Sequence, residues 1–208
     1  MEQTYMKEQP ILNLLLKMSL PMVVSMLVNS LYNIVDSFFV AKISENAMTA
    51  LSLVFPVQNL INAVMIGFGI GINAVISFYL GAADQKKADQ AASQGMLLGT
   101  FHGILLMIIC LVVIHPFLSL FTNDAEIVNL GLRYSKIVFL FSVFFAWELV
   151  FEKVFQAVGK MNISMICLMS GCLVNIFLDP VLIFGIGPFP VLRVTGAAIA
   201  TVTAQMIV

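Results

Sequence analysis

The sequence predicts an all-α integral membrane protein built as a bundle of six transmembrane helices. Hydrophobic residues make up 61 % of the 208-residue chain and charged residues 10 %, with a mean hydropathy of +1.03. Soluble domains contain about half apolar and a quarter charged residues, so this composition is typical of a membrane protein. Because a transmembrane helix needs about 20 apolar residues, a chain of this length has room for about six.

The apolar stretches give the order of these helices. We expect the first three at about residues 19–41, 48–80 and 94–119, with the polar stretch GAADQKKADQAA between the second and third. The second is longer than one crossing needs, so it is expected to tilt or to extend beyond the lipid. Five glycines have the GxxxG spacing that is typical of close helix packing, namely Gly67, Gly71, Gly95, Gly99 and Gly103.

We expect the fourth and fifth helices at about residues 131–155 and 164–184, and the sixth from 196 onward. The stretch FTNDAEIVNL precedes the fourth, where Thr122 or Asn123 is expected to cap a short surface helix. The Gly/Pro loop GIGPFPVLRV joins the fifth to the sixth. Residues 196–208 are too few to cross a bilayer. We therefore expect the sixth helix to be incomplete and the chain to be a fragment of a larger protein.

Two aspartates within these apolar stretches are the strongest indication of function. A carboxylate near the middle of a membrane helix costs roughly 2.5–3.5 kcal/mol on the insertion scale. Asp36 lies in the first expected helix and Asp179 in the fifth, and each follows a polar residue by four positions, Tyr32 and Asn175 respectively. Residues four apart share a helix face, so each aspartate has a polar partner beside it. This arrangement predicts a cation site.

Pro180 follows Asp179 directly and strengthens this interpretation. Proline has no N–H, so the carbonyl of Ile176 loses its helical donor. A carboxylate, an amide oxygen and a free carbonyl within one turn are hard oxygen ligands, suited to Na⁺ or to a transferable proton. The alternative is that Asp179 lies at the membrane surface, near the end of its helix.

The first helix carries a polar stripe at spacings of three and four residues, formed by Asn29, Tyr32, Asn33 and Asp36. Such a narrow stripe faces a bundle interior or a water-filled cavity rather than lipid. Pro21, about four turns earlier, is a candidate kink point. The alternative is a structural role, in which these side chains hold helices together through hydrogen bonds without transport.

In the fourth helix Glu148 and Glu152 also share a face. We expect Glu152 to pair locally and hypothesise that Glu148 faces a cavity. The three cysteines, Cys110, Cys167 and Cys172, form no CxxC pair and are interpreted as buried thiols. No cofactor is expected beyond a coupling ion.

Charge excludes one class of partner and gives an orientation. The net charge of −1 offers no basic patch for nucleic acid. With the N-terminus in the cytoplasm, more basic residues lie inside than outside, as the positive-inside rule requires. The cytoplasmic residues would be Lys7, Lys17, Lys86, Lys87, Lys153 and Lys160, and the external ones Lys42, Arg133, Lys136 and Arg193. A multi-pass protein of the cytoplasmic (inner) membrane is therefore expected.

Four segments, in this order, resemble the first half of the multidrug and toxic compound extrusion (MATE) transporters. They are LPMVVSMLVNSLYNIVDSFFVAKI, GFGIGINAVISFYLGAADQKKA, CLVNIFLDPVLIF and GAAIAT. The resemblance implies a transporter of two six-helix lobes, of which this chain supplies the N-terminal lobe and lacks the C-terminal one. It also implies export of organic cations in exchange for H⁺ or Na⁺. The implied coupling-cation site, which would also suit Na⁺ as a metal, comprises Asp36, Asn175, Asp179 and Thr201, supported by Tyr32, Asn33, Pro21 and Pro180.

Three other functions compete with antiport. A lipid-linked oligosaccharide flippase of the same superfamily would need a basic cavity, whereas the expected membrane interior holds acids and no Lys or Arg. An intramembrane aspartyl protease also uses two membrane aspartates, but its GxGD motif is absent, so no enzyme is predicted. A structural membrane subunit is the third alternative.

Overall fold

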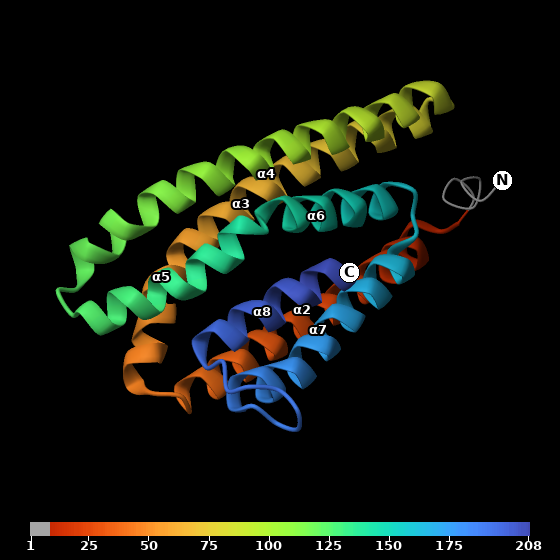
Figure 1. Ribbon diagram of the computed structural model, residues 1–208. Helices are drawn as coiled ribbons and strands as arrows, with labels where there is room; N and C mark the ends of the chain where they lie inside the picture. The colour runs from red at the N-terminus through yellow and green to blue at the C-terminus, as the bar shows by residue number, and fades with distance from the viewer. Residues whose placement is uncertain (1–8) are drawn as a thin grey trace.

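The computed structural model describes residues 9–208, and within this range all regular structure is helical (Figure 1). Lys7, which contributed to the expected orientation, lies outside the described residues. The helices are α2 (Ile11–Ala41), α3 (Glu45–Gly81), α4 (Gln85–Phe121), α5 (Ala125–Leu140), α6 (Ser142–Ala157), α7 (Met161–Phe184) and α8 (Val194–Ile207).

Capping residues define several of the helix ends. Ser44 caps α3 by accepting a hydrogen bond from the Ala47 N–H at 3.0 Å, and Asp84 caps α4 in the same way. Gly185 ends α7 in the left-handed conformation, with φ of +71°, which glycine adopts without steric cost. Asp124, rather than Thr122 or Asn123, caps α5, and the expected short surface helix is the first part of α5 itself.

Three expected helices differ in extent from the observed ones. The third begins at Gln85 instead of residue 94, so most of the stretch GAADQKKADQAA, expected between two helices, belongs to α4. The first begins at Ile11 instead of residue 19, since an apolar segment continues the helix toward the N-terminus. The fourth, expected as one helix over 131–155, is divided into α5 and α6 at Phe141. The Ser142 hydroxyl donates to the Phe139 carbonyl at 2.7 Å beside this break. Such a side-chain bond competes with the backbone hydrogen bonds of a helix and often bends it.

The helices form two groups that meet along one line of contact (Figure 1). In one group α2 and α8 pack against α7, and in the other α3, α4, α5 and α6 pack against one another. The contact between α5 and α8 joins the groups, whereas the consecutive helices α2 and α3 touch little. This arrangement leaves room for a cavity between the groups, beyond the α5–α8 junction.

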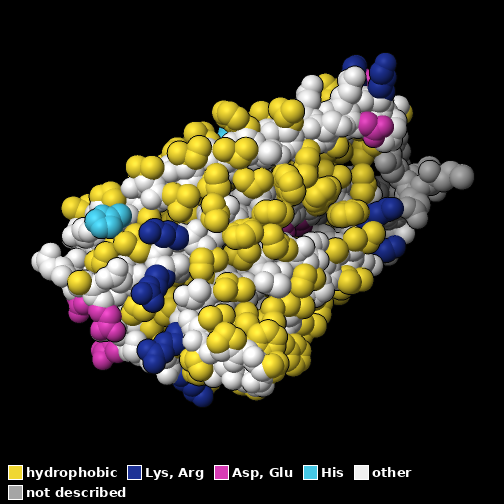
Figure 2. Space-filling view, in the orientation of Figure 1, with side chains coloured by type: hydrophobic (Ala, Val, Ile, Leu, Met, Phe, Trp, Pro, Cys, Tyr) yellow, Lys and Arg dark blue, Asp and Glu magenta, His cyan; other side chains and the backbone are white. Residues whose placement is uncertain are grey.

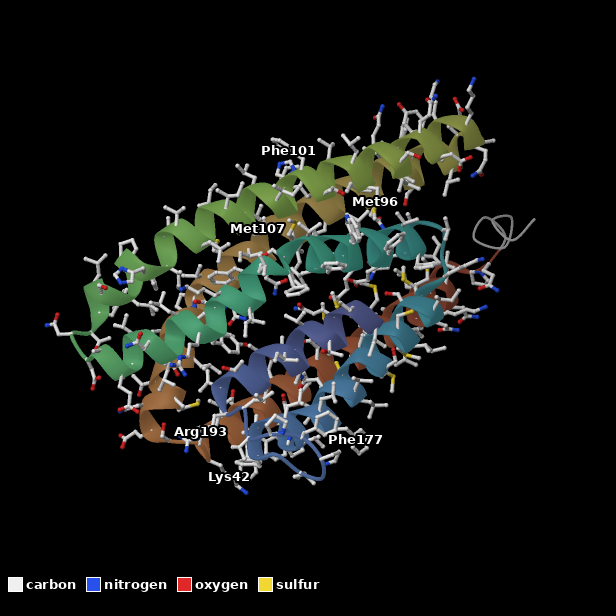
Figure 3. All side chains as sticks on the ribbon, in the orientation of Figure 1. Lys42, Met96, Phe101, Met107, Phe177 and Arg193 are labelled. Atoms are coloured by element: carbon white, nitrogen blue, oxygen red, sulfur yellow. The ribbon has the colours of Figure 1, made fainter. Side chains whose placement is uncertain are left out.

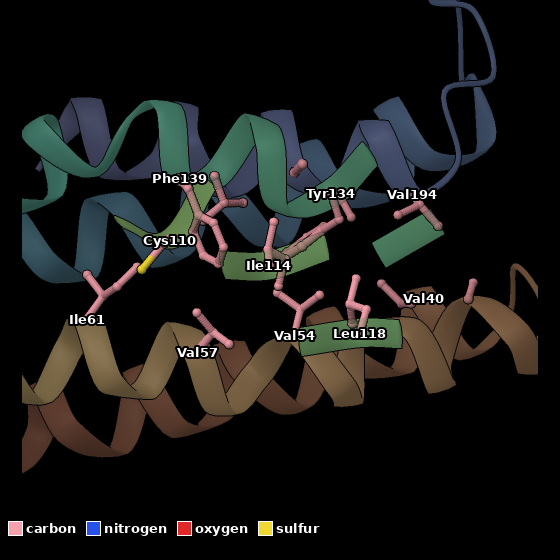
Figure 4. Close-up of a cluster of buried hydrophobic side chains, with 14 of the residues drawn as sticks. Val40, Val54, Val57, Ile61, Cys110, Ile114, Leu118, Tyr134, Phe139 and Val194 are labelled. Carbon is pink, nitrogen blue, oxygen red and sulfur yellow. The ribbon is translucent and has the colours of Figure 1, made fainter. Parts of the chain in front are cut away.

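The main hydrophobic core lies beside this junction (Figure 4). Side chains from α3, α4 and α5 fill it, and residues of α2 and α8 complete it. They include Val40, Val54, Ile114, Leu118, Phe139 and Val194. Dense packing here fixes the spacing of the two groups at one end of the cavity.

The glycines of α4 allow close contact with neighbouring helices, as the GxxxG spacing predicted. A Cβ added at Gly95 would lie 2.8 Å from the Ile72 side chain, and one at Gly99 would lie 2.7 Å from that of Val150. Gly67 and Gly71 make no such contact within residues 9–208, where a Cβ at either position would meet nothing within 4 Å.

The outer surface is suited to lipid. Four helices, α2, α3, α4 and α7, are long and apolar enough to cross a membrane, and α8 is a shorter apolar helix. Hydrophobic side chains cover most of the visible face, and charged ones gather mainly toward its ends (Figure 2). Lys42 and Arg193, both assigned to the external side, lie at the same end of the molecule (Figure 3). The chain is therefore a multi-pass membrane protein.

Candidate functional site

A cavity of about 1600 Å³ lies between the two helix groups. Its walls come from α2, α3, α5, α6, α7 and α8, and Figure 2 shows acidic atoms deep within a hydrophobic surround. The expected site residues Tyr32, Asn33, Asp36, Asn175 and Thr201 all line it. About half of the other lining side chains are apolar, several of them methionines, and Ser, Asn and Gln side chains make up much of the rest.

The best-defined part of the site joins α7 to α8. Asn175 and Asp179 are both fully buried. With its amide oriented to suit its neighbours, Asn175 donates from Nδ2 to Asp179 Oδ2 at 2.9 Å, and its oxygen accepts from the Thr201 N–H at 3.3 Å. The Thr201 hydroxyl donates to the Ala197 carbonyl at 3.0 Å. The Asn175–Asp179 pair that the sequence predicted and Thr201, which the family resemblance implied, therefore form one hydrogen-bonded unit.

The α2 side completes this cluster. The side chains of Asp36 and Asp179 interact directly, although the two residues are 143 positions apart in the sequence. Tyr32 interacts with the Thr201 hydroxyl. Asp36 Oδ1 and Asp179 Oδ1 are buried, and no group in the described range 9–208 donates a hydrogen bond to either oxygen. Two adjacent carboxylates with unsatisfied oxygens form an environment that a cation stabilises.

Two members of this cluster were missed by the sequence reasoning. Tyr134 of α5 is buried, interacts with Thr201 and hydrogen-bonds to Gln58 of α3, with the Gln58 Nε2 atom 3.4 Å from the Tyr134 hydroxyl. The only sequence indication was a polar Tyr134–Ser135 pair in an apolar segment. Through these residues the cluster extends from α2, α7 and α8 to the second helix group.

The supporting residues are placed in different ways. Asn33 lines the cavity but hydrogen-bonds within its own helix, from Nδ2 to the Asn29 carbonyl at 2.8 Å. Pro21 is buried inside α2, where its carbonyl accepts from the Ser25 hydroxyl at 2.9 Å. Pro180 lies inside α7, and α7 continues past it to Phe184, so Asp179 is within the helix rather than at its end.

A second polar cluster lies on the α6 wall of the cavity. Glu148, Glu152, Lys153 and Gln156 line it, as hypothesised for Glu148. Glu152 pairs with Lys153, whose Nζ is 3.1 Å from Glu152 Oε1. The expectation of an interior without basic residues was therefore wrong, although the charge of Lys153 is compensated by its neighbour.

These groups favour cation chemistry. Carboxylate, amide and hydroxyl oxygens are the ligands that Na⁺ accepts, and an adjacent carboxylate pair also holds a proton. Among residues 9–208, no three His, Cys, Asp or Glu side chains gather as a transition-metal site would require. Cys110 and Cys172 are buried free thiols.

Comparison with known proteins identifies the family. The MatE family model matches residues 21–181. The chain belongs to the MATE family. The MATE resemblance seen in the four sequence segments is thereby confirmed, and with it an all-helical lobe.

The relatives of this MATE chain are considerably longer. It is 32 % identical over 204 residues to the multidrug export protein MepA of Staphylococcus haemolyticus, covering 98 % of this chain and 44 % of MepA. It superposes on an outward-facing multidrug resistance MATE transporter with a TM-score of 0.86 and 28 % identity, covering 92 % of this chain and 42 % of that one.

A crystal structure of a MATE mutant gives a TM-score of 0.90 at 26 % identity, covering 99 % of this chain and 45 % of that one. The chain therefore spans less than half the length of these relatives and corresponds to their N-terminal lobe.

Proposed function

We propose that this chain is the N-terminal lobe of a cation-coupled antiporter that exports organic cations. H⁺ or Na⁺ would bind at Asp36, Asn175, Asp179 and Thr201, and its inward movement would drive export. The proposal includes a location in the cytoplasmic membrane with the N-terminus inside. MepA, a multidrug export protein, supports drug efflux as the activity.

The observation that carries this proposal is the pair of unsatisfied aspartate oxygens beside the cavity. Neither Asp36 Oδ1 nor Asp179 Oδ1 has a hydrogen-bond donor in the described part of the chain, although both atoms are buried. Structural hydrogen bonding between helices would leave these oxygens satisfied, because an unpaired buried polar group is costly. A bound proton or Na⁺ would remove that cost.

Coupling follows if the negative charge of the aspartate pair attracts both the coupling ion and the drug into the lobe. With both aspartates ionised, the lobe attracts either a small cation or an organic one. Loading of H⁺ or Na⁺ neutralises the pair and weakens the attraction for the drug, which leaves. Because Asp36 is on α2, the change in charge can act on that helix, with Pro21 as its bending point.

The cavity wall suits organic cations of varied shape. Methionine side chains are flexible and polarizable, and Met18, Met22, Met26, Met48 and Met161 all contribute to the lining. Phenylalanine rings at Phe55 and Phe145 add flat apolar surface. Such a wall adapts to different molecules, and the acids select those with positive charge.

The test is ethidium accumulation in drug-sensitive cells that express the native protein carrying this chain. Wild type should lower accumulation, whereas Asp36→Asn and Asp179→Asn should not, at matched membrane abundance. Asp89→Asn is the control, because Asp89 is exposed on α4 and its carboxylate, within the described structure, accepts a hydrogen bond only from Gln85.

Export by either aspartate mutant at the wild-type level would refute the coupling role. If wild type does not change ethidium accumulation, organic cations are not the substrate. The flippase and the structural subunit are then the favoured alternatives. Export driven in vesicles by an imposed pH gradient or an imposed Na⁺ gradient distinguishes the two coupling ions.

A further inference from the structure

Two glutamates on the α6 wall, Glu148 and Glu152, lie one helical turn apart and both line the cavity, but their surroundings differ. Glu152 Oε1 interacts with Lys153 Nζ at 3.1 Å and also accepts from the Gln156 amide. Its charge is therefore compensated within α6.

Lys153 is held in this arrangement by its other contacts. Its Nζ also donates to Gln156 Oε1 at 3.1 Å, and its backbone carbonyl accepts from Asn73 Nδ2 at 2.9 Å. Its aliphatic stem packs over Gly69 of α3, where an added Cβ would lie 2.8 Å from Lys153 Cγ. The ammonium group is committed to Glu152 and Gln156 and is not directed to Glu148.

Glu148 has no such compensation. Its Oε2 atom is buried, and nothing between residues 9 and 208 donates a hydrogen bond to it. The α7 residue next to it is Cys172, a neutral thiol. A buried carboxylate without a partner is costly, so a positive charge that enters the cavity is stabilised at this point.

We propose that Glu148 anchors the positively charged group of the organic cation, separately from the coupling ion at Asp36 and Asp179. This inference rests on the proposed function and assigns the substrate a binding residue of its own. The fitting ligand is a lipophilic monovalent cation, such as a quaternary ammonium or phosphonium ion. Phe145, Leu149 and Leu168 line the same cavity and offer apolar contact to its substituents.

The two positions are close enough to influence each other. Cys172, beside Glu148, and Asp179 are seven residues apart on α7, which corresponds to about 10 Å along the helix. At this separation and away from water, a cation at one position raises the electrostatic cost of a cation at the other. Drug and coupling ion would therefore compete through charge without sharing ligands.

The experiment measures binding of tetraphenylphosphonium, a permanent lipophilic cation, to the purified native protein that carries this chain. Glu148→Gln should raise the Kd by roughly tenfold or more, because it removes the charge and keeps the shape. Glu148→Asp should restore part of the affinity. Glu126→Gln is the matched control, since Glu126 is exposed at the start of α5 and bonded to Asn46 at 2.7 Å.

The variants must also show that the coupling site is intact. In Glu148→Gln, residual phosphonium binding should still weaken as H⁺ or Na⁺ is added, because Asp36 and Asp179 are unchanged. An unaltered Kd in Glu148→Gln overturns the inference and leaves the proposed function standing. A loss of the H⁺ or Na⁺ effect, with phosphonium affinity retained, also overturns it, because Glu148 would then hold the coupling ion. If wild type neither binds phosphonium nor exports ethidium, the proposed function itself fails.

Discussion

Asn175 donates from Nδ2 to Asp179 Oδ2 at 2.9 Å while its own oxygen accepts from the Thr201 N–H at 3.3 Å. One amide thus orients a buried carboxylate and links α7 to α8. Because Oδ2 is held in this way, the other oxygen of Asp179 is the one that remains without a donor. The amide therefore determines which oxygen of Asp179 keeps an unmet need for a hydrogen-bond donor or a cation.

Replacing this amide should weaken both the fold and the site. Asn175→Ala leaves Asp179 Oδ2 without its donor in a buried environment and removes the link to Thr201, at a cost of about 1–3 kcal/mol. We expect a lower unfolding temperature in detergent and a weaker dependence of drug binding on H⁺ or Na⁺. Asn162→Ala, at an exposed position near the start of α7, should change neither measurement. Wild-type stability and ion dependence in Asn175→Ala would contradict the orienting role.

A second prediction concerns the ion pair on α6. Glu152→Gln removes the negative charge that compensates Lys153. It leaves the ammonium group of Lys153 uncompensated in the cavity wall. That positive charge should repel an organic cation, so the Kd for tetraphenylphosphonium should rise although Glu148 is unchanged. The double variant Glu152→Gln with Lys153→Met should recover much of the affinity, because it removes both charges. If the double variant binds as weakly as the single one, Glu152 acts directly on the ligand.

The two aspartates of the candidate site could be predicted from the sequence alone. Charge is so costly in lipid that Asp36 and Asp179 indicated a function without any structure, and the i, i+4 rule gave their partners Tyr32 and Asn175. Their proximity across helices α2 and α7 is a tertiary fact that the local pattern did not contain. Thr201 entered only through the family resemblance, because a threonine in an apolar helix is unremarkable.

The helix break at Phe141, the role of Tyr134 and the packing of Gly67 and Gly71 could not be predicted from the sequence. The break at Phe141 lies in a segment without proline, and glycine occurs only at its start, so apolar periodicity predicted one continuous helix. Tyr134 reached the site because this break gives α5 its own direction toward α3 and α8. Gly67 and Gly71 had the spacing of packing glycines, yet their side of α3 has no neighbour within 4 Å among the described residues.

The third prediction compares two glycines, one in a tight contact between helices and one with open space beside it. A Cβ at Gly196 would lie 2.6 Å from the backbone carbonyl of Leu182, where α8 packs on α7. One at Gly67 would meet nothing within 4 Å in the described part of the chain. Gly196→Ala should therefore destabilise the protein by about 1–3 kcal/mol through overpacking. Gly67→Ala should be neutral or stabilising by up to about 1 kcal/mol, because alanine favours helix. Thermal unfolding in detergent measures both, and equal effects would show that the α7–α8 contact is less tight than described.

The fourth prediction tests whether α2 transmits the coupling. Asp36 is 15 residues from Pro21, or about 22 Å along α2, so a bend at Pro21 would produce a large movement at the aspartate. Pro21→Ala gives the helix a backbone N–H donor and removes the ring clash, which stabilises the straight form. One net hydrogen bond of about 0.5–1.5 kcal/mol predicts that ethidium export slows by roughly two- to tenfold. Tetraphenylphosphonium affinity should change little, because the charged groups of the cavity remain in place.

Pro56→Ala is the matched control for this test, since Pro56 also lies inside a helix of the cavity wall, is exposed, and is not on α2. Export by Pro56→Ala should match wild type at equal membrane abundance. If Pro21→Ala also exports at the wild-type rate, bending of α2 is not part of the cycle. The charge state of Asp36 would then have to act through its direct contact with Asp179 and, from there, through the hydrogen-bonded unit that joins α7 to α8.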